Sequence, residues 1–333
     1  MKTEQLHEDL QPIISTFKNY KAPRLEKLSV SNARNLPTLN NAVAEQMAEH
    51  FSARALGLVK PNPESVGEIE HILIPAFDGQ LLARVYHPSK KEDRSESPVV
   101  VYFHGGGWVI ANLDTYDASC RALCNTLDAV VVSVAYRQAP EAPFPAATED
   151  AYFSLQWVLQ NASSFHGNPT QVVVAGESAG GNLATVACLL SKERKARVPV
   201  GQLLIYPVVD ATTQRPSYTD NADTVPLNAA MMDWFFKHYL EDDTQRNDPL
   251  VSPYLADVSG LPPAFVITAE FDPLRDEGRD YAIKLQKAGV ETQHHDVLGV
   301  VHEFFGLSGV VKPAKDSLKY IADWFDRLVG RYS

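Results

Sequence analysis

Residues 172–182 read Val172-Val173-Val174-Ala175-Gly176-Glu177-Ser178-Ala179-Gly180-Gly181-Asn182, and this stretch decides the fold. A short apolar run rich in β-branched valine predicts a buried strand that stops at Gly176. Small residues then open a predicted helix, so Ser178 occupies a tight turn between strand and helix. The glycines let strand and helix approach closely, and such a strained turn lifts a serine hydroxyl above the edge of the sheet. The pattern indicates a nucleophilic serine.

The composition is that of a globular protein with a small, uncharged partner. The chain has 333 residues, 45% of them hydrophobic, which is enough to bury a substantial core. Its formal net charge is -11 and its pI is near 5.4. Nucleic acids and anionic membranes are bound through basic surfaces, so this balance argues against both kinds of partner.

Targeting signals and cysteine content favour a cytoplasmic protein. Residues 1–9 carry acids where a signal peptide has a cationic start followed by an apolar run. Apolar runs such as Val99–Phe103 are far shorter than the about 20 residues of a membrane span. Reduced thiols fit the cytoplasm, and Cys120, Cys124 and Cys188 are interpreted as free and buried. The i,i+4 spacing of the first two leaves a metal or redox pair open.

Two helical regions are interpreted as parts of a lid. Residues 1 to about 60 are helical in pattern and are broken by prolines, with one good helix from Asn40 to a glycine stop at Gly57. They carry no catalytic motif and form the predicted N-terminal cap segment. A second helix, Asn228–Leu240, is apolar around most of its surface and belongs to a predicted cap insertion at about 211–245. An ordinary core helix is the alternative for this second segment.

The rest of the chain, residues 61–333, is predicted to be a catalytic domain of α/β class. Alternating apolar residues on either side of Asp78-Gly79 predict an antiparallel hairpin at the edge of a sheet. Strands and helices then alternate, which indicates a mostly parallel sheet with helices on both faces. The predicted strands are Val99–Phe103, Val130–Val134, Gln171–Ala175, Leu203–Tyr206, Phe265–Thr268 and Gln293–Leu298. The predicted helices are Asp114–Leu127, Ala146–Gln160, one after Ser178, and Asp276–Ala288.

A serine nucleophile needs a histidine base, and His302 is the candidate. It follows the last predicted strand in the loop Gly299–Gly306, where its side chain can reach the same edge of the sheet as Ser178. His294 and His295 lie within that strand, one on each face, and are interpreted as structural. The other histidines lie in segments away from the carboxyl ends of the last strands.

The orienting acid is expected at the end of another strand. Asp272 comes just after the preceding predicted strand. Asp276 and Glu277 are better explained as acids of a first helical turn, which the helix dipole favours. Ser178, Asp272 and His302 then follow one another in the order typical of α/β-hydrolases.

Oxyanion donors are expected from the end of an earlier strand. Directly after Phe103 stand His104-Gly105-Gly106-Gly107-Trp108. Three residues without side chains let backbone N–H groups turn toward a substrate oxygen. Gly106, Gly107 and Ala179, the residue after the serine, are the predicted donors.

With these residues in place, the chain resembles the hormone-sensitive-lipase-like carboxylesterases of the α/β-hydrolase fold. The resemblance covers roughly residues 68–330 and rests on several motifs in family order. The motifs are His104–Trp108; Tyr136-Arg137 with Pro140-Glu141 and Pro143–Ala146; Gly176–Gly181; Tyr206-Pro207; Asp272–Gly278; and His302 with Phe304. The family implies an α/β-hydrolase fold with a helical cap built from the N-terminus and from an insertion after the sixth strand.

Four positions depart from the common pattern of the family, and none of them removes a catalytic group. Glu177 stands where much of the family carries aspartate, and Ala111 replaces a frequent glycine. Tyr116 replaces a frequent histidine, and Glu303 follows the base where glycine is common. The change at Glu303 is expected to alter the rim of the pocket, and the role of Glu177 stays open.

The residues and the resemblance together predict a serine-dependent carboxylic ester hydrolase that uses no cofactor and no metal. Its expected substrates are short to medium acyl esters, cleaved with water through an acyl-enzyme intermediate. Tyr206, Met231 and Trp234 are the candidates for lining the substrate pocket. An amidase or lactonase with the same three catalytic residues stays open, as does a homodimer. The resemblance also covers receptors that lack the base, and the presence of all three groups speaks against such a ligand-binding protein.

Overall fold

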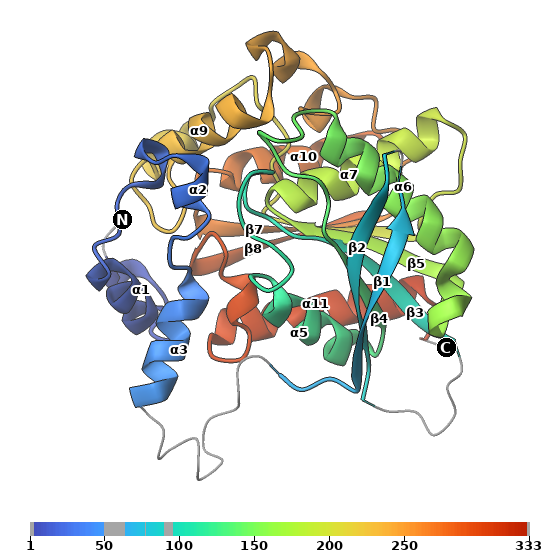
Figure 1. Ribbon diagram of the computed structural model, residues 1–333, viewed down its shortest axis with the longest axis horizontal. Helices are drawn as coiled ribbons and strands as arrows, with labels where there is room; N and C mark the ends of the chain where they lie inside the picture. Colours follow the sequence, from blue (N-terminus) through green and yellow to red (C-terminus); the bar gives the residue numbers. More distant parts are fainter. Residues whose placement is uncertain (1–2, 50–63, 77, 90–95, 332–333) are drawn as a thin grey trace.

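One eight-stranded sheet forms the centre of the protein in the computed structural model, which describes residues 3–49, 64–76, 78–89 and 96–331. The strands are β1 (Glu68–Pro75), β2 (Gln80–His87), β3 (Ser97–Phe103), β4 (Val130–Val134), β5 (Gly167–Glu177), β6 (Gly201–Ile205), β7 (Ala264–Phe271) and β8 (Thr292–Val301). Their order is β1-β2-β4-β3-β5-β6-β7-β8 (Figure 1). β2 pairs antiparallel with β1 and β4, and the other pairs are parallel. The predicted hairpin and the mostly parallel sheet are confirmed.

Long helices cover both faces of this sheet. They are α5 (Asp117–Leu127), α6 (Ala146–Asn161), α7 (Ala179–Glu193), α10 (Arg275–Lys287) and α11 (Lys312–Leu328). α5 and α11 lie against one face, and α6, α7 and α10 lie against the other (Figure 1). The short 3₁₀ helices are η1 (Thr3–Gln5), η2 (Leu25–Lys27), η3 (Ala162–Phe165), η4 (Asp243–Asn247), η5 (Pro253–Leu255) and η6 (Phe305–Leu307). The predicted α/β class is therefore confirmed.

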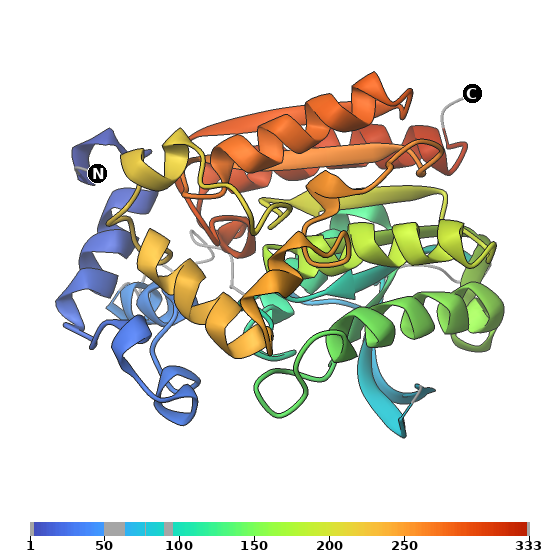
Figure 2. The same ribbon diagram turned by 90° about the horizontal axis from the view of Figure 1, so that it is seen from above.

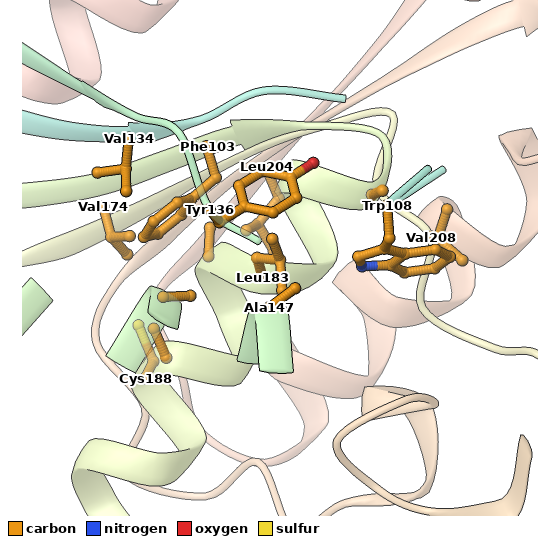
Figure 3. Packing of buried hydrophobic residues seen from close by; sticks show 14 of the residues in the cluster. Phe103, Trp108, Val134, Tyr136, Ala147, Val174, Leu183, Cys188, Leu204 and Val208 are labelled. Atoms are coloured by element: carbon orange, nitrogen blue, oxygen red, sulfur yellow. The ribbon is translucent and has the colours of Figure 1, made fainter. Parts of the chain in front are cut away.

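Alternate residues of the central strands face opposite helical layers. In β3, Val101 and Phe103 belong to the core under α6 and α7, whereas Val100 and Tyr102 belong to the core under α5 and α11. Figure 3 shows side chains of the first core, in which Phe103 packs in the same cluster as Leu183 of α7. A strand that buries both of its faces needs apolar residues at every position, which explains the uninterrupted valine runs.

Two parts of the chain that are far apart in sequence lie together at one end of the sheet. The first holds α1 (Leu10–Asn19), α2 (Val30–Ala33) and α3 (Leu39–Glu49), and the second holds α8 (Pro216–Asp220) and α9 (Ala229–Tyr239). α9 lies beside the N-terminal helices in Figures 1 and 2, and Nε1 of Trp234 donates to the backbone O of Leu28 at 3.3 Å. We call these parts the N-terminal cap and the inserted cap.

Two predictions about the first part of the chain concern residues that the structure does not describe. Gly57, the predicted end of the cap helix, and the domain boundary near residue 60 lie outside the described residues. No helix in the described ranges is both long and apolar enough to cross a membrane.

The carboxyl ends of the parallel strands carry the predicted site. β3 leads into the glycine-rich turn after Phe103, β5 into Ser178, β7 into Asp272 and β8 into His302. Because parallel strands end at the same edge of a sheet, these four segments meet although they are far apart in sequence. Residues of both caps line the cavity over this edge, so the sheet positions the chemistry and the caps enclose it.

Candidate active site

Ser178 lies on the sharp turn between β5 and α7. Its backbone has φ 57° and ψ -119°, a conformation that is costly for a residue with a side chain. A Cβ on Gly176 would come within 2.1 Å of the backbone O of Gly180, and one on Gly180 within 1.9 Å of the backbone O of Phe103. Glycine at both positions therefore lets strand and helix meet closely enough to present the serine at the edge of the sheet.

The structure brings Ser178, Asp272 and His302 into hydrogen-bond contact. Nε2 of His302 lies 2.9 Å from Oγ of Ser178, and Nδ1 of His302 lies 2.6 Å from Oδ2 of Asp272. The other carboxylate oxygen, Oδ1, accepts a hydrogen bond from the backbone N–H of Leu274 at 2.9 Å. All three side chains are buried. This arrangement can move a proton from serine to histidine and hold the resulting imidazolium beside a carboxylate.

The charges around His302 favour its protonated form. Burial by itself lowers the pKa of an imidazole, because it removes water from the charged state. The negative charge and the hydrogen bond of Asp272 outweigh burial, with further contributions from Glu303 and Glu177, so the pKa of His302 is raised above its ordinary value. His302 is therefore a stronger base toward the serine proton than a histidine in water.

Two of the three predicted oxyanion donors, Gly106 and Gly107, line the same cavity as Ser178, and the third, Ala179, directly follows Ser178 in the chain. Gly106 and Gly107 have φ angles of 98° and 58°, which glycine adopts at little cost. Ala179 is the first residue of α7, where N–H groups have no intrahelical acceptor. Among the described residues, none of these three N–H groups has a hydrogen-bond acceptor. They are free to donate to the oxygen of a substrate.

A cavity of about 260 Å³ opens over these groups, beneath the two caps. Gly106, Gly107, Ser178 and His302 lie at its base. The apolar residues of its wall are Phe17, Ala22, Pro23, Leu25, Ala33, Leu36, Pro37, Leu39, Ile110, Ala111, Val225, Pro226, Leu227, Met231 and Phe235. The wall suits an apolar group of a substrate whose reacting carbonyl lies at the base.

Of the three residues predicted to line the pocket, Met231 lines this cavity and Tyr206 and Trp234 do not. The hydroxyl of Tyr206 donates to Glu177, and its ring packs against His302 with ring centroids 4.5 Å apart. The indole of Trp234 points to a backbone carbonyl of the N-terminal cap. The predictions for Tyr206 and Trp234 are wrong, because a place near a strand end or in a cap helix does not fix the direction of the side chain.

Metal-binding groups and thiols take no part in this arrangement of side chains. The described residues hold no cluster of three or more histidine, cysteine, aspartate or glutamate side chains that could bind a metal ion. Cys120, Cys124 and Cys188 are buried and free of disulfides. Burial raises the pKa of each thiol, which makes all three poor nucleophiles.

Comparisons with known proteins assign this chain to a family. A family model described as alpha/beta hydrolase fold matches residues 100–306. The carboxylic ester hydrolase LipN of Mycobacterium tuberculosis is 41% identical over 269 residues, 78% of this chain and 70% of LipN. The carboxylesterase NlhH of the same organism is 42% identical over 275 residues, 80% of this chain and 85% of NlhH. The chain belongs to the hormone-sensitive-lipase-like carboxylesterases.

Solved structures agree with this membership. An esterase from Pyrobaculum calidifontis, 36% identical, matches with a TM-score of 0.81 over 96% of this carboxylesterase and 98% of that chain. An α/β hydrolase from the metagenome of Lake Arreo, 33% identical, matches with a TM-score of 0.85 over 98% and 99% of the two chains. The predicted family, the α/β-hydrolase fold and the assignment as an ester hydrolase are confirmed.

Glu177, whose role the sequence leaves open, lies buried next to Ser178 in this carboxylesterase. Its carboxyl group accepts hydrogen bonds from the hydroxyls of Tyr102 in β3 and Tyr206 after β6. Burial raises the pKa of Glu177 to about 7, although hydrogen bonds from neighbouring hydroxyls oppose the rise. The Glu177 side chain therefore connects the ends of three adjacent strands, β3, β5 and β6, at the residue that precedes Ser178.

Glu303 and Tyr116, two departures from the family pattern, form a pair in this carboxylesterase. The hydroxyl of Tyr116 donates to Oε1 of Glu303 at 2.7 Å. Glu303 has a φ of 66°, in the region that favours the glycine common at this position. It also lines the cavity beside His302. The sequence does not predict this pairing, because 186 intervening residues separate the two positions. The only signal for it in the sequence is that both positions depart from the family pattern.

Proposed function

We propose that Ser178, His302 and Asp272 form the catalytic triad of this carboxylesterase and that the reaction passes through an acyl-enzyme. The observation that carries the proposal is the 2.9 Å contact between Nε2 of His302 and Oγ of Ser178, backed by the 2.6 Å contact of Nδ1 with Asp272. A serine hydroxyl becomes a good nucleophile when a base takes its proton, and the base needs a partner that fixes its tautomer.

Acylation begins as Oγ of Ser178 attacks the ester carbonyl and Nε2 of His302 takes the hydroxyl proton. The carbonyl oxygen becomes an oxyanion, which accepts hydrogen bonds from the N–H groups of Gly106, Gly107 and Ala179. Asp272 stabilises the imidazolium across its short contact with Nδ1. The tetrahedral intermediate then expels the alcohol, which takes the proton from His302, and the acyl group stays on the serine.

Deacylation repeats these steps with water as the nucleophile. His302 takes a proton from water, the resulting hydroxide attacks the acyl carbonyl, and the same donors hold the second oxyanion. When this intermediate collapses, the proton on Nε2 returns to Oγ of Ser178 and the carboxylic acid leaves. The cycle restores the free enzyme without any cofactor.

A purified-enzyme assay with a series of p-nitrophenyl esters tests the proposed substrate range. We expect the highest kcat/KM for acetate to hexanoate esters and a steep loss toward palmitate. The cavity of about 260 Å³ is slightly smaller than typical ligand pockets, which span roughly 300–1,000 Å³. A relative from Pseudomonas putida, 34% identical, is named ethyl acetate hydrolase, and acetate is a short acyl group. A maximum at long, emulsified esters contradicts the proposal.

The pH dependence of kcat/KM is expected to follow the protonation of His302. The base must be neutral to accept the serine proton, so activity rises with pH and levels off above the pKa of His302. Because this pKa is raised above the ordinary value of about 6.5, the half-maximal point should lie above pH 6.5. Circular dichroism over the same pH range separates titration from unfolding. A half-maximal point well below pH 6.5 in folded enzyme contradicts the assignment.

Cell location and self-association are further proposals. We propose a cytoplasmic location, because three buried cysteines without disulfides suit a reducing compartment. We also propose a homodimer, because β8 is an edge strand and its Leu298 is 66% exposed. Cell fractionation and light scattering measure the two properties, and a secreted or a monomeric protein contradicts the respective proposal.

A further inference from the structure

The turn that carries two of the oxyanion donors has an unusual backbone. Gly106, Gly107, Trp108 and Ala111 all have positive φ angles, of 98°, 58°, 62° and 68°. Trp108 and Ala111 bear side chains, and such residues keep this conformation only where their surroundings hold them in place. The positions of the donors therefore depend on contacts from outside the turn.

One group of contacts comes from the inserted cap and from the segment after β4. The ring of Trp108 stacks on Tyr239 of α9, with centroids 4.2 Å apart and an interplanar angle of 3°. Gly107 packs so closely on Phe235 that a Cβ there would come within 2.2 Å of the phenyl ring. The backbone N–H of Ala139 donates to the backbone O of Trp108 at 2.9 Å. These contacts hold the middle of the turn.

A second group of contacts comes from one residue of the N-terminal cap. Arg34, directly after α2, donates from Nε to the backbone O of Val109 at 2.8 Å and from Nη2 to the backbone O of Ala139 at 3.0 Å. It also donates from Nη1 and Nη2 to the two carboxylate oxygens of Glu141, each at 2.7 Å. One planar guanidinium thus bridges the turn, the neighbouring segment and an acid, which the ammonium of a lysine cannot reproduce.

The acid of this group orients the arginine. The side chain of Glu141 is 63% exposed, and the hydrogen bond from Arg34 holds its pKa down to about 2, so it stays ionised. An ion pair this exposed contributes little to stability by itself. Val109 and Ala139, in contrast, are buried, so their carbonyls have little access to water as a substitute partner. The bonds to the two carbonyls are therefore the important ones.

We propose that Arg34 is a positioning residue for the oxyanion hole, so that docking of the N-terminal cap completes the catalytic geometry. The inference rests on the proposed roles of Gly106 and Gly107 as oxyanion donors. Without the guanidinium, the carbonyl of Val109 loses its partner and the strained turn relaxes, which moves the donors away from the substrate oxygen. The substrate still binds in the apolar cavity, so the loss falls on the transition state.

Steady-state kinetics of Arg34→Ala and Arg34→Lys with p-nitrophenyl butyrate test this inference. We expect Arg34→Ala to lower kcat by about 10- to 100-fold, the scale of a misplacement near 1 Å, with KM changed by less than about 3-fold. A trifluoromethyl ketone adds to Ser178 and places its oxyanion in the hole, so its affinity should fall by a similar factor. Low concentrations of guanidinium ion should restore part of the kcat of Arg34→Ala, and Arg34→Lys should lose activity as well.

Two control variants separate positioning from general stability. Arg194→Ala removes a surface arginine that binds both carboxylate oxygens of Glu149, at 2.9 and 2.6 Å, away from the active site. It should keep the kcat of the unchanged enzyme, and Glu141→Gln should lose much less activity than Arg34→Ala.

The inference is overturned if Arg34→Ala keeps its kcat and its affinity for the ketone, or if Arg194→Ala loses them equally. If Arg34→Ala does not fold, an unchanged kcat in Arg34→Lys overturns it as well. Failure of the proposed catalytic roles has a different signature, because the unchanged enzyme would then form no adduct between the ketone and Ser178.

Discussion

Ser178→Ala is expected to lower kcat for p-nitrophenyl ester hydrolysis by about 10⁶-fold, the scale seen when a triad serine is removed. The hydroxyl oxygen is the atom that bonds to the acyl group, and Nε2 of His302 lies 2.9 Å from it. The variant therefore loses both the atom that attacks the ester and the proton that His302 accepts. Residual rate over water comes from the oxyanion donors and from substrate binding, which the variant keeps. Kinetics with purified variant and labelling by a fluorophosphonate probe measure the loss.

Ser154→Ala is the matched control for this variant. Ser154 is a buried serine of α6, and its hydroxyl has no hydrogen-bond partner among the described residues. The same substitution there should leave turnover and labelling unchanged, and thermal unfolding should show both variants folded. Substantial turnover by folded Ser178→Ala, or fluorophosphonate labelling at another residue, contradicts the proposed nucleophile.

Asp272→Asn is expected to lower kcat by about 10⁴-fold through the tautomer of His302. Oδ1 of Asp272 accepts a hydrogen bond from the backbone N–H of Leu274, so an asparagine would keep its amide oxygen there. Its NH₂ group then faces Nδ1 of His302, which must become an acceptor. The ring proton moves to Nε2, where it blocks transfer from Ser178.

The same variant should also shift the pH profile. Asp272 is the main group that raises the pKa of His302 against burial, so its neutral replacement lowers that pKa and moves the half-maximal point of residual kcat/KM to lower pH. Asp276→Asn is the control, because Asp276 accepts from the backbone N–H of Ser217 and pairs with Arg275 outside the triad. A larger loss of activity in Asp276→Asn than in Asp272→Asn contradicts the assignment of the acid.

The contacts among the three central residues of the site could be predicted from the sequence because they follow from strand topology. Ser178, Asp272 and His302 each come directly after a strand, and parallel strands deliver their carboxyl ends to one edge. A pattern of apolar runs is enough to locate these positions. The contact distances and the pairing of Tyr116 with Glu303 depend on side-chain packing, which a single sequence does not specify.

The surroundings of a helical residue are a further property that the sequence pattern leaves open. Glu277, predicted as a first-turn acid of a helix, lies in the first turn of α10. It is also fully buried and accepts a hydrogen bond from the backbone N–H of Val209, and burial raises its pKa to about 8. The helical position was right, but tertiary contacts decide its surroundings. α11 was missed although a signal existed, because Ala314, Leu318, Ile321 and Phe325 are spaced by three or four residues along one face.

The contacts of Arg34 show most clearly what a single sequence cannot predict. Its partners Val109 and Ala139 lie 75 and 105 residues away, and both contacts are through backbone carbonyls. Backbone acceptors leave no trace in the side-chain pattern, and Arg34 lies in a segment without any catalytic motif. Its contact with the oxyanion turn is visible only in the folded structure.

The stacking of Trp108 on Tyr239 has a consequence for engineering. Trp108 of the oxyanion turn and Tyr239 of α9 pack against each other. The inserted cap therefore cannot be exchanged without affecting the turn that carries the oxyanion donors. A chimera that borrows this cap from another esterase to widen the substrate range would have to carry a compatible aromatic at position 239. A change of the inserted cap is therefore expected to alter substrate specificity and reaction rate at the same time.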